Sequence, residues 1–234
     1  MTTTLSVRDV ITATPRVRIL RLDIAGTPFP FAAGQAVMAG LHGSLLRKPY
    51  SIASGPSEAA RRGWIELLVQ VDESGGPDPH LELARPGTAL DLEGPFGSFA
   101  LPSLGQEAAV LLVAGGTGIA PLRSMLVDAL DRPFPPRISV AYSARSVDEL
   151  AYRAELEALA AAGRIRLVMT VTREPHERWP GRRGRIGRAL LADALPERDA
   201  WCLICGPPAL VQDVRAGLGA LGVSEQRIVV ERYE

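Results

Sequence analysis

Residues 111–121 read Leu-Leu-Val-Ala-Gly-Gly-Thr-Gly-Ile-Ala-Pro, and this stretch decides the fold. An apolar run ends in three glycines within four positions, and a proline then precedes an amphipathic segment. This pattern predicts a buried strand, a tight turn and the start of a helix. Such a turn points free backbone N–H groups and the positive end of a helix dipole outward, which suits a phosphate group.

The chain is β-rich before this turn. Glycine and proline separate short extended segments, which cover residues 17–24, 36–39, 50–53, 64–71 and 89–93. Short strands at this spacing are typical of an antiparallel barrel. A short helical turn is predicted near residues 80–84.

Strands and helices alternate after the turn. The strand candidates cover residues 108–114, 137–142, 164–171, 200–205 and 227–232. Helical spacing between them covers residues 122–130, 146–162, 186–195 and 209–221. Ser146 and Glu149 form a capping box at the start of the second helix. The alternation predicts a five-stranded parallel, doubly wound sheet with helices on both faces. We therefore predict a β-barrel domain over residues 1–103 and an α/β domain over residues 104–234.

The composition is that of an ordinary globular chain without a global charge. Of the 234 residues, 47% are hydrophobic and 22% are charged, and the formal net charge is zero, so nothing favours nucleic acid or an anionic membrane. The N-terminus lacks the basic and apolar regions of a signal peptide, and no apolar run could span a membrane. The two cysteines, Cys202 and Cys205, are too few for an iron–sulfur cluster and fit a reducing, cytoplasmic compartment.

Three segments carry candidate chemistry. Residues 116–121 follow the dinucleotide-binding pattern G-x-G-x-x-G with proline in the last position, but no acidic residue for the ribose follows about 20 positions later. Residues 47–54 place two cations, a phenol and hydroxyl groups on one extended segment. Residues 205–208 begin at Cys205, at the carboxyl end of a strand, where doubly wound sheets bind ligands. Each segment alone is also compatible with a purely structural role.

The order of these segments resembles the ferredoxin–NADP reductase family, in its form without an iron–sulfur domain. The matching segments cover residues 48–51, 94–99, 115–121, 205–208 and 231–233. The resemblance spans nearly the whole chain. It implies a flavin-binding barrel followed by a domain that binds a nicotinamide dinucleotide, and it favours FAD over FMN.

The resemblance also implies roles for residues of the first domain. Tyr50 would pack along the flavin, and Ser51 would lie beside the flavin atom that receives hydride. Lys48 replaces the family's phosphate-binding arginine, for which Arg47 could substitute. Asp78 stands where relatives place a serine or threonine for the pyrophosphate, which leaves FMN as an alternative. The implied cofactor-binding residues here are Arg47, Lys48, Pro49, Tyr50, Ser51, Ile52, Gln70, Gly76 and Pro77.

In the second domain, the glycine turn would meet the pyrophosphate of the nicotinamide dinucleotide, with Cys205 near the nicotinamide. Glu231 and Tyr233 match the family's terminal Glu-x-aromatic, whose ring stacks on the flavin until nicotinamide displaces it. Residues 172–173 match the pair that touches the 2′-phosphate in NADP-specific relatives, which favours NADPH. The implied cofactor-binding residues are Gly116, Thr117, Gly118, Ile119, Pro121, Arg145, Thr172, Arg173, Cys205, Gly206 and Pro207. The implied catalytic residues are Ser51, Cys205, Glu231 and Tyr233.

The implied reaction is reduction of bound FAD by NAD(P)H, followed by single-electron transfer to a separate protein. A ferredoxin, a flavodoxin or an oxygenase component would be the acceptor. Two alternatives stay open, namely an electron-transfer subunit that works only inside a larger complex and a free-flavin reductase. We expect a monomer or weak dimer with no metal site and no nucleic-acid or membrane partner.

Overall fold

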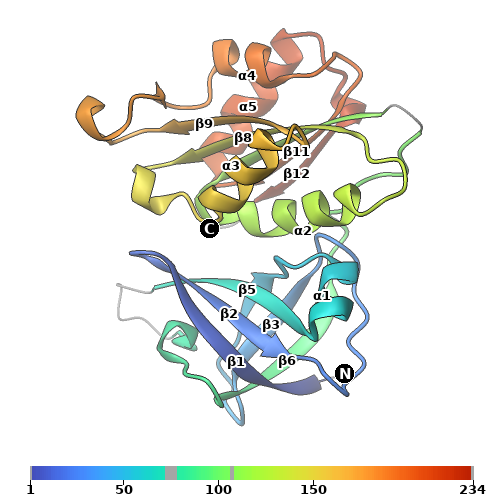
Figure 1. Cartoon of the computed structure of the whole chain (residues 1–234), viewed down its shortest axis with the longest axis vertical. Coiled ribbons are helices and arrows are strands. Elements are labelled where there is room, and N and C mark those ends of the chain that lie inside the picture. Colours follow the sequence, from blue (N-terminus) through green and yellow to red (C-terminus); the bar gives the residue numbers. More distant parts are fainter. Residues whose placement is uncertain (1, 72–77, 106–107, 233–234) are drawn as a thin grey trace.

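The computed structural model describes residues 2–71, 78–105 and 108–232. It contains two six-stranded sheets, one formed by the first half of the chain and one by the second. Figure 1 shows the two halves stacked along the long axis, with the blue and cyan barrel below the α/β half. Within the described residues, no helix is long and apolar enough to cross a membrane. The domain boundary after residue 103 stays a prediction.

The first sheet forms the predicted barrel. Its strands are β1 (Thr2–Thr14), β2 (Val17–Asp23), β3 (Ala36–Leu41), β4 (Lys48–Ser51), β5 (Trp64–Gln70) and β6 (Ala89–Phe96). The strands pair antiparallel in the order β4-β3-β6-β1-β2-β5. A bridge between Ile52 and Leu67 joins the two edges of this sheet and closes it. The enclosed core is apolar, and Leu20, Ile65 and Leu90 are completely buried in it.

Two elements of the barrel half were not predicted. Strand β1 was not predicted because polar residues dominate its sequence. In its first half, the buried apolar side chains are Leu5 and Val7. Helix α1 (Pro56–Arg62) is a short connection after β4. It begins with proline in its first turn, and Glu58 Oε2 accepts a hydrogen bond from the Gly55 N–H at 3.3 Å. The predicted helical turn near residues 80–84 is confirmed as η1 (Leu81–Leu83).

The second sheet is parallel, as predicted, but has six strands instead of five. Its strands are β7 (Ala109–Gly115), β8 (Arg137–Ala144), β9 (Arg166–Val171), β10 (Arg182–Arg183), β11 (Trp201–Gly206) and β12 (Ile228–Arg232). They pair in the order β10-β9-β8-β7-β11-β12. The prediction missed β10 because this edge strand consists of two exposed arginines and has no hydrophobic pattern. Strand β7 lies inside the sheet, and all its residues are buried.

Helices cover both faces of the parallel sheet. The four α-helices of this half are α2 (Ile119–Leu130), α3 (Arg153–Ala161), α4 (Arg188–Ala194) and α5 (Pro208–Ala220). Side chains alternate along β7, so that Leu112 packs in the cluster under α2 and α3, whereas Leu111 and Val113 pack under α4 and α5. This arrangement confirms the doubly wound prediction.

The helix predicted over residues 146–162 begins later, at Arg153. Residues 147–149 form a 3₁₀ turn, η3 (Val147–Glu149), and Ser146 makes no side-chain capping hydrogen bond. The Val147 N–H instead donates to Glu174 Oε2 at 2.8 Å. A carboxylate distant in sequence therefore replaces the predicted capping box.

Helix α2 joins the two halves. It lies on the side of the parallel sheet that faces the barrel (Figure 1). Arg123 of α2 is 5% exposed and donates hydrogen bonds to the Ala53 carbonyl at 2.9 Å and to Glu58 of α1 at 3.0 Å. The next residue, Ser124, donates to the Ser54 carbonyl at 2.6 Å. Because α2 directly follows the glycine turn, these contacts fix the turn relative to the barrel.

Candidate functional site

A cavity of about 1120 Å³ lies between the two halves of the molecule. The barrel contributes Arg16, Ala36, Lys48, Pro49, Tyr50, Ser51, Leu68, Gln70, Val71, Asp78 and Phe96 to its wall. The α/β half contributes Thr117, Gly118, Ala120, Pro121, Cys205, Glu231 and Arg232. The predicted segments at residues 48–51, 116–121 and 205 therefore meet around one space, although they are far apart in the chain.

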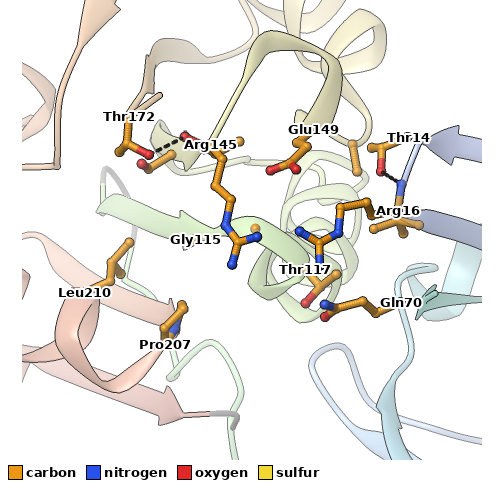
Figure 2. Close-up of a pocket in the computed structure, with 15 residues that line it drawn as sticks. Thr14, Arg16, Gln70, Gly115, Thr117, Arg145, Glu149, Thr172, Pro207 and Leu210 are labelled. Atoms are coloured by element: carbon orange, nitrogen blue, oxygen red, sulfur yellow. Dashed lines mark hydrogen bonds between the residues drawn. The ribbon is translucent and has the colours of Figure 1, made fainter. Parts of the chain in front are cut away.

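A second cavity of about 360 Å³ adjoins the first. Arg16, Gln70 and Thr117 line both cavities, and the boundary that these three residues form between the cavities is called the passage below. Figure 2 shows this second cavity with Arg145 and Thr172 on the far side from the barrel. Its wall also includes Gly115, Gly116 and Pro207, so the glycine turn and the segment after β11 border it together.

The glycine turn has the conformation that its sequence requires. Gly116 has a φ of +55°, a left-handed conformation that side chains rarely adopt. A Cβ atom on Gly118 would collide with the carbonyl oxygen of Cys205. Residues 116–118 form a 3₁₀ turn, and Pro121 lies in the first turn of the helix that follows. The predicted strand, turn and helix are thus confirmed, and the close packing brings the turn against the end of β11.

Buried Cys205 and half-buried Glu231 form a pair on neighbouring parallel strands. They are register partners of β11 and β12, and Cys205 Sγ lies 3.6 Å from Glu231 Oε2. Burial raises the pKa of the Cys205 thiol well above its ordinary value, and the Glu231 carboxylate adds to this shift. Burial also raises the pKa of Glu231, although the hydrogen bond from the thiol opposes that shift. Cys205 is therefore a protonated hydrogen-bond donor and a poor nucleophile.

The two cations at the start of β4, Arg47 just before it and Lys48 as its first residue, have different environments. Lys48 lines the large cavity, and its ammonium group forms an ion pair with Asp78, which also lines that cavity. Arg47 instead forms ion pairs with Glu93 and Asp91 of β6. Arg47 is not among the described residues that line the large cavity, and its expected substitution for Lys48 at the phosphate stays a prediction.

Several other predicted residues lie away from the two cavities in the described structure. Ile52 and Ile119 are buried in the two hydrophobic cores. Gly206 is buried under the turn, beside Gly115. Arg173 has an exposed side chain, and its backbone N–H donates to the Arg145 carbonyl at 2.7 Å. Gly76, Pro77 and Tyr233 lie outside the described residues, so their predicted roles stay predictions.

Sequence reasoning missed part of the cavity wall. Arg16 lies in the turn between β1 and β2, and this turn could not be assigned because β1 was not predicted. Phe96 and Arg232 line the large cavity from the ends of β6 and β12. Glu149 lines the small cavity from η3. A Thr-Pro pair at residues 14–15 was the available signal for the turn.

Comparisons with known proteins agree with this geometry. Residues 3–101 match the oxidoreductase FAD-binding domain, and residues 112–216 match the oxidoreductase NAD-binding domain. Ferredoxin–NADP reductase B of Sorangium cellulosum is 37% identical over 231 residues, covering 94% of this chain and 93% of the relative. The chain belongs to the ferredoxin–NADP reductase family. It is an NAD(P)H-dependent flavoprotein oxidoreductase that uses FAD.

More distant members of this reductase family act with other partners, according to their names. The gamma subunit of sulfhydrogenase 1 from Pyrococcus furiosus is 30% identical over 204 residues, covering 86% of this chain and 67% of the relative. The crystal structure of the Amycolatopsis cytochrome P450 reductase GcoB superposes with a TM-score of 0.84 at 27% identity. That superposition covers 99% of this reductase and 70% of the other chain.

The cleft of this reductase fits the cofactors of the family. The large cavity exceeds the range of about 300–1,000 Å³ that is usual for ligand pockets, so it can hold a flavin ring together with a nicotinamide. Its wall combines the Tyr50 and Phe96 rings with the Lys48 and Arg16 cations, a set that suits an aromatic ligand with an anionic tail. Glycine at positions 116 and 118 allows a close approach of pyrophosphate to the backbone.

Proposed function

We propose that this reductase takes electrons from NADPH and passes them through bound FAD to a separate electron-carrier protein, such as a ferredoxin, a flavodoxin or an oxygenase component. The observation that carries the proposal is the single cavity on which residues 48–51, the glycine turn and the Cys205–Glu231 pair converge. Bound FAD would supply the chemistry, because it accepts two electrons from a nicotinamide and can release them one at a time. The protein's task is to bind and orient both cofactors.

The barrel residues would hold the flavin. Tyr50 and Ser51 lie half-buried at the end of β4 and face the cavity, so we assign them to the flavin ring and its polar edge. Pro49 and Gln70 lie beside them in the same wall. Lys48 is the cation at this end of the cavity, and we assign it to the flavin phosphate, which must compete with Asp78 for the ammonium group.

The α/β residues would hold the nicotinamide dinucleotide. Thr117 and Gly118 offer the turn at the start of α2 to the pyrophosphate. Cys205 would contact the nicotinamide as a neutral thiol, and Glu231 would hold that thiol in place through their hydrogen bond. Tyr233, at the chain end beyond the described residues, would cover the flavin until nicotinamide binds.

We also propose that NADPH is preferred to NADH. Arg145 and Thr172 line the far wall of the small cavity, where the adenosine half of the dinucleotide would lie (Figure 2). Arg173 follows Thr172 directly in the chain and has an exposed side chain, which we propose turns toward the 2′-phosphate when NADPH is bound. A 2′-phosphate would receive charge-assisted hydrogen bonds from such groups. The name of the Sorangium relative, which includes NADP, supports this preference.

A second candidate function is that of an electron-transfer subunit of a larger complex. The named gamma subunit of a sulfhydrogenase among the relatives favours it. A free-flavin reductase, in which flavin is a substrate, is a further alternative. The Lys48–Asp78 ion pair favours it, because Asp78 competes with the flavin phosphate for the Lys48 ammonium group and would weaken flavin binding. Both buried cysteines are free, which supports a location in the reducing cytoplasm.

The decisive experiment begins with the purified chain. Flavin released by acid would be identified by mass, and reduction rates would then be measured with NADH and NADPH. We expect FAD that stays bound during gel filtration, faster reduction by NADPH, and electron transfer from the isolated chain to a ferredoxin or an artificial acceptor. Protein that neither carries flavin nor gains it from added FAD or FMN would refute the proposal. Activity that appears only after flavin is added as a substrate would instead favour the free-flavin reductase.

A further inference from the structure

The two cavities meet at a passage formed by Arg16, Gln70 and Thr117. If a nicotinamide dinucleotide places its nicotinamide beside Cys205 and its adenosine beside Arg145, the link between these halves must cross the passage. In a dinucleotide, that link is the pyrophosphate. We infer that Arg16, contributed by the barrel, binds this pyrophosphate from the side opposite the glycine turn. The inference rests on the proposed function and adds a ligand contact from the other half of the molecule.

The turn that carries Arg16 is held in place by its own hydrogen bonds. The Arg16 N–H donates to Thr14 Oγ1 at 3.2 Å, as Figure 2 shows, and the Arg16 carbonyl accepts from the Val71 N–H at 2.8 Å. Arg18 Nη1 donates to the carbonyls of Thr14 at 3.1 Å and Val17 at 3.2 Å. Both the N–H and the carbonyl of Arg16 are therefore hydrogen-bonded, which fixes the position of the backbone that carries the Arg16 side chain.

The charges around the passage favour an anion. In Figure 2 the Arg16 guanidinium lies beside Thr117, and the Arg145 guanidinium reaches toward the same space from the opposite side. Glu149 supplies one carboxylate to the same wall, so these three charged side chains sum to one positive charge. Two guanidinium groups that face one cavity repel each other, and a pyrophosphate between them would relieve that repulsion. The backbone of the glycine turn adds N–H groups on the Thr117 side.

This contact would give the dinucleotide partners in both halves of the reductase. The glycine turn and Arg145 belong to the α/β half, whereas Arg16 belongs to the barrel. An arginine suits the position because its planar fork can donate two parallel hydrogen bonds to phosphate oxygens. Lysine at this position would keep the charge and lose that fork.

The test compares Arg16→Met and Arg16→Lys with the wild-type protein. Methionine keeps much of the apolar stem and removes the charge. The matched control is Arg8→Met, which removes one charge from β1, the strand that precedes the Arg16 turn, at an exposed position that lines neither cavity. Calorimetry would measure binding of NADP⁺, of ADP-ribose, and of adenosine 2′-monophosphate, which has no pyrophosphate. Flavin affinity and thermal unfolding would be measured on the same variants.

We expect Arg16→Met to raise the dissociation constants of NADP⁺ and ADP-ribose roughly ten- to hundredfold, which is the usual loss for a charge-assisted hydrogen bond. Arg16→Lys should lose less, and adenosine 2′-monophosphate should bind all variants equally. In turnover, the loss should fall on KM for the dinucleotide rather than on kcat. Arg8→Met should match the wild type throughout.

Equal binding of NADP⁺ by Arg16→Met and the wild type would overturn the inference. A loss of flavin affinity with unchanged NADP⁺ binding would also overturn it, because Arg16 would then belong to the flavin site. If the wild type binds NADP⁺ but NADPH does not reduce its flavin, the proposed function fails while the Arg16 comparison still holds, since calorimetry needs no turnover. If Arg16→Met unfolds at a lower temperature, Arg16→Lys provides the comparison in a folded protein.

Discussion

Arg123→Met would remove the cation at the centre of the contact between α2 and the barrel. Arg123 donates to Glu58 at 3.0 and 3.2 Å and to Glu155 at 2.7 and 2.8 Å, and its Nη1 lies 3.7 Å from Glu66 Oε2. Its guanidinium also lies 4.7 Å from the centre of the Tyr152 ring. Burial opposes the charge, but the hydrogen bonds to Glu155 and Glu58 hold the pKa of Arg123 above its ordinary value.

The magnitude follows from the burial of the partners. The side chains of Glu58 and Glu66 are 6% and 2% exposed, and the substitution removes the cation that they share. Each carboxylate keeps a more exposed arginine partner, Arg62 for Glu58 at 3.4 Å and Arg21 for Glu66 at 3.0 Å, so we expect the lower part of the range that follows. Removing one partner of a buried ion pair usually costs about 3–5 kcal/mol. For a chain of this size, about 2–4 °C per kcal/mol gives a fall in unfolding midpoint of roughly 6–20 °C. Glu155 is more exposed and contributes less to this loss.

The assay is thermal unfolding followed by circular dichroism, with Arg61→Met as the matched control. Arg61 also joins the two halves, through a 2.8 Å ion pair with Asp131 at the end of α2, but its side chain is 61% exposed. This control should cost only about 0–1 kcal/mol. Adding Glu58→Gln to Arg123→Met should recover part of the lost stability, because it removes one of the two buried charges that lost their shared cation.

Two results would refute this reasoning. The first is a loss of stability in Arg123→Met that is no larger than that of Arg61→Met. The second is a double variant that is less stable than Arg123→Met by the full cost of Glu58→Gln alone, since this additivity would mean that the two residues do not interact.

Three further predictions concern charged groups. Asp78→Asn should release Lys48 and tighten binding of FAD and FMN, but not of uncharged riboflavin, in fluorescence titrations; equal changes for all three would contradict a role at the phosphate. Arg173→Ala and Arg145→Ala should each raise KM for NADPH roughly ten- to hundredfold and KM for NADH much less, in steady-state assays with both cofactors; equal effects would count against 2′-phosphate recognition. Hydrogen bonds from His42, Thr4 and Gly43 hold the pKa of Asp91 well below its usual range, so its contribution to stability is complete above about pH 4 and is lost as the pH falls further. Asp91→Asn should therefore flatten the acid side of the stability profile, and an unchanged profile would exclude this linkage.

Local patterns predicted the parts of the fold whose signal is local. The β7 run is buried on both faces, so it reads as a continuous apolar stretch, and the glycine turn after it could be located to the residue. The strand–helix alternation then determined the parallel sheet. The segments at residues 48–51 and 205 came to the same cavity as the turn because strands of both sheets end at the contact between the halves.

The missed features depend on partners that are distant in sequence. Ser146 looked like a helix cap, but Glu174 binds the first N–H of that turn. The ion pairs of Arg47 with Glu93 and Asp91 of β6 were not predicted. Arg16 carries no local motif and lines the passage only because a polar strand pairs into the barrel. These contacts join residues that are distant in sequence, so no local hydrophobic pattern in the sequence indicates them.

The Arg123 contact bears on how this protein could be recombined with its relatives. A chimera cut in the connection near residue 103 would separate Glu58 and Glu66 from Arg123, and would leave two buried acids facing a foreign helix. A cut placed after α2 would keep these three residues together, but would divide the parallel sheet after its first strand. The smallest exchangeable module thus includes both halves, unless the incoming partner carries an arginine in the same place.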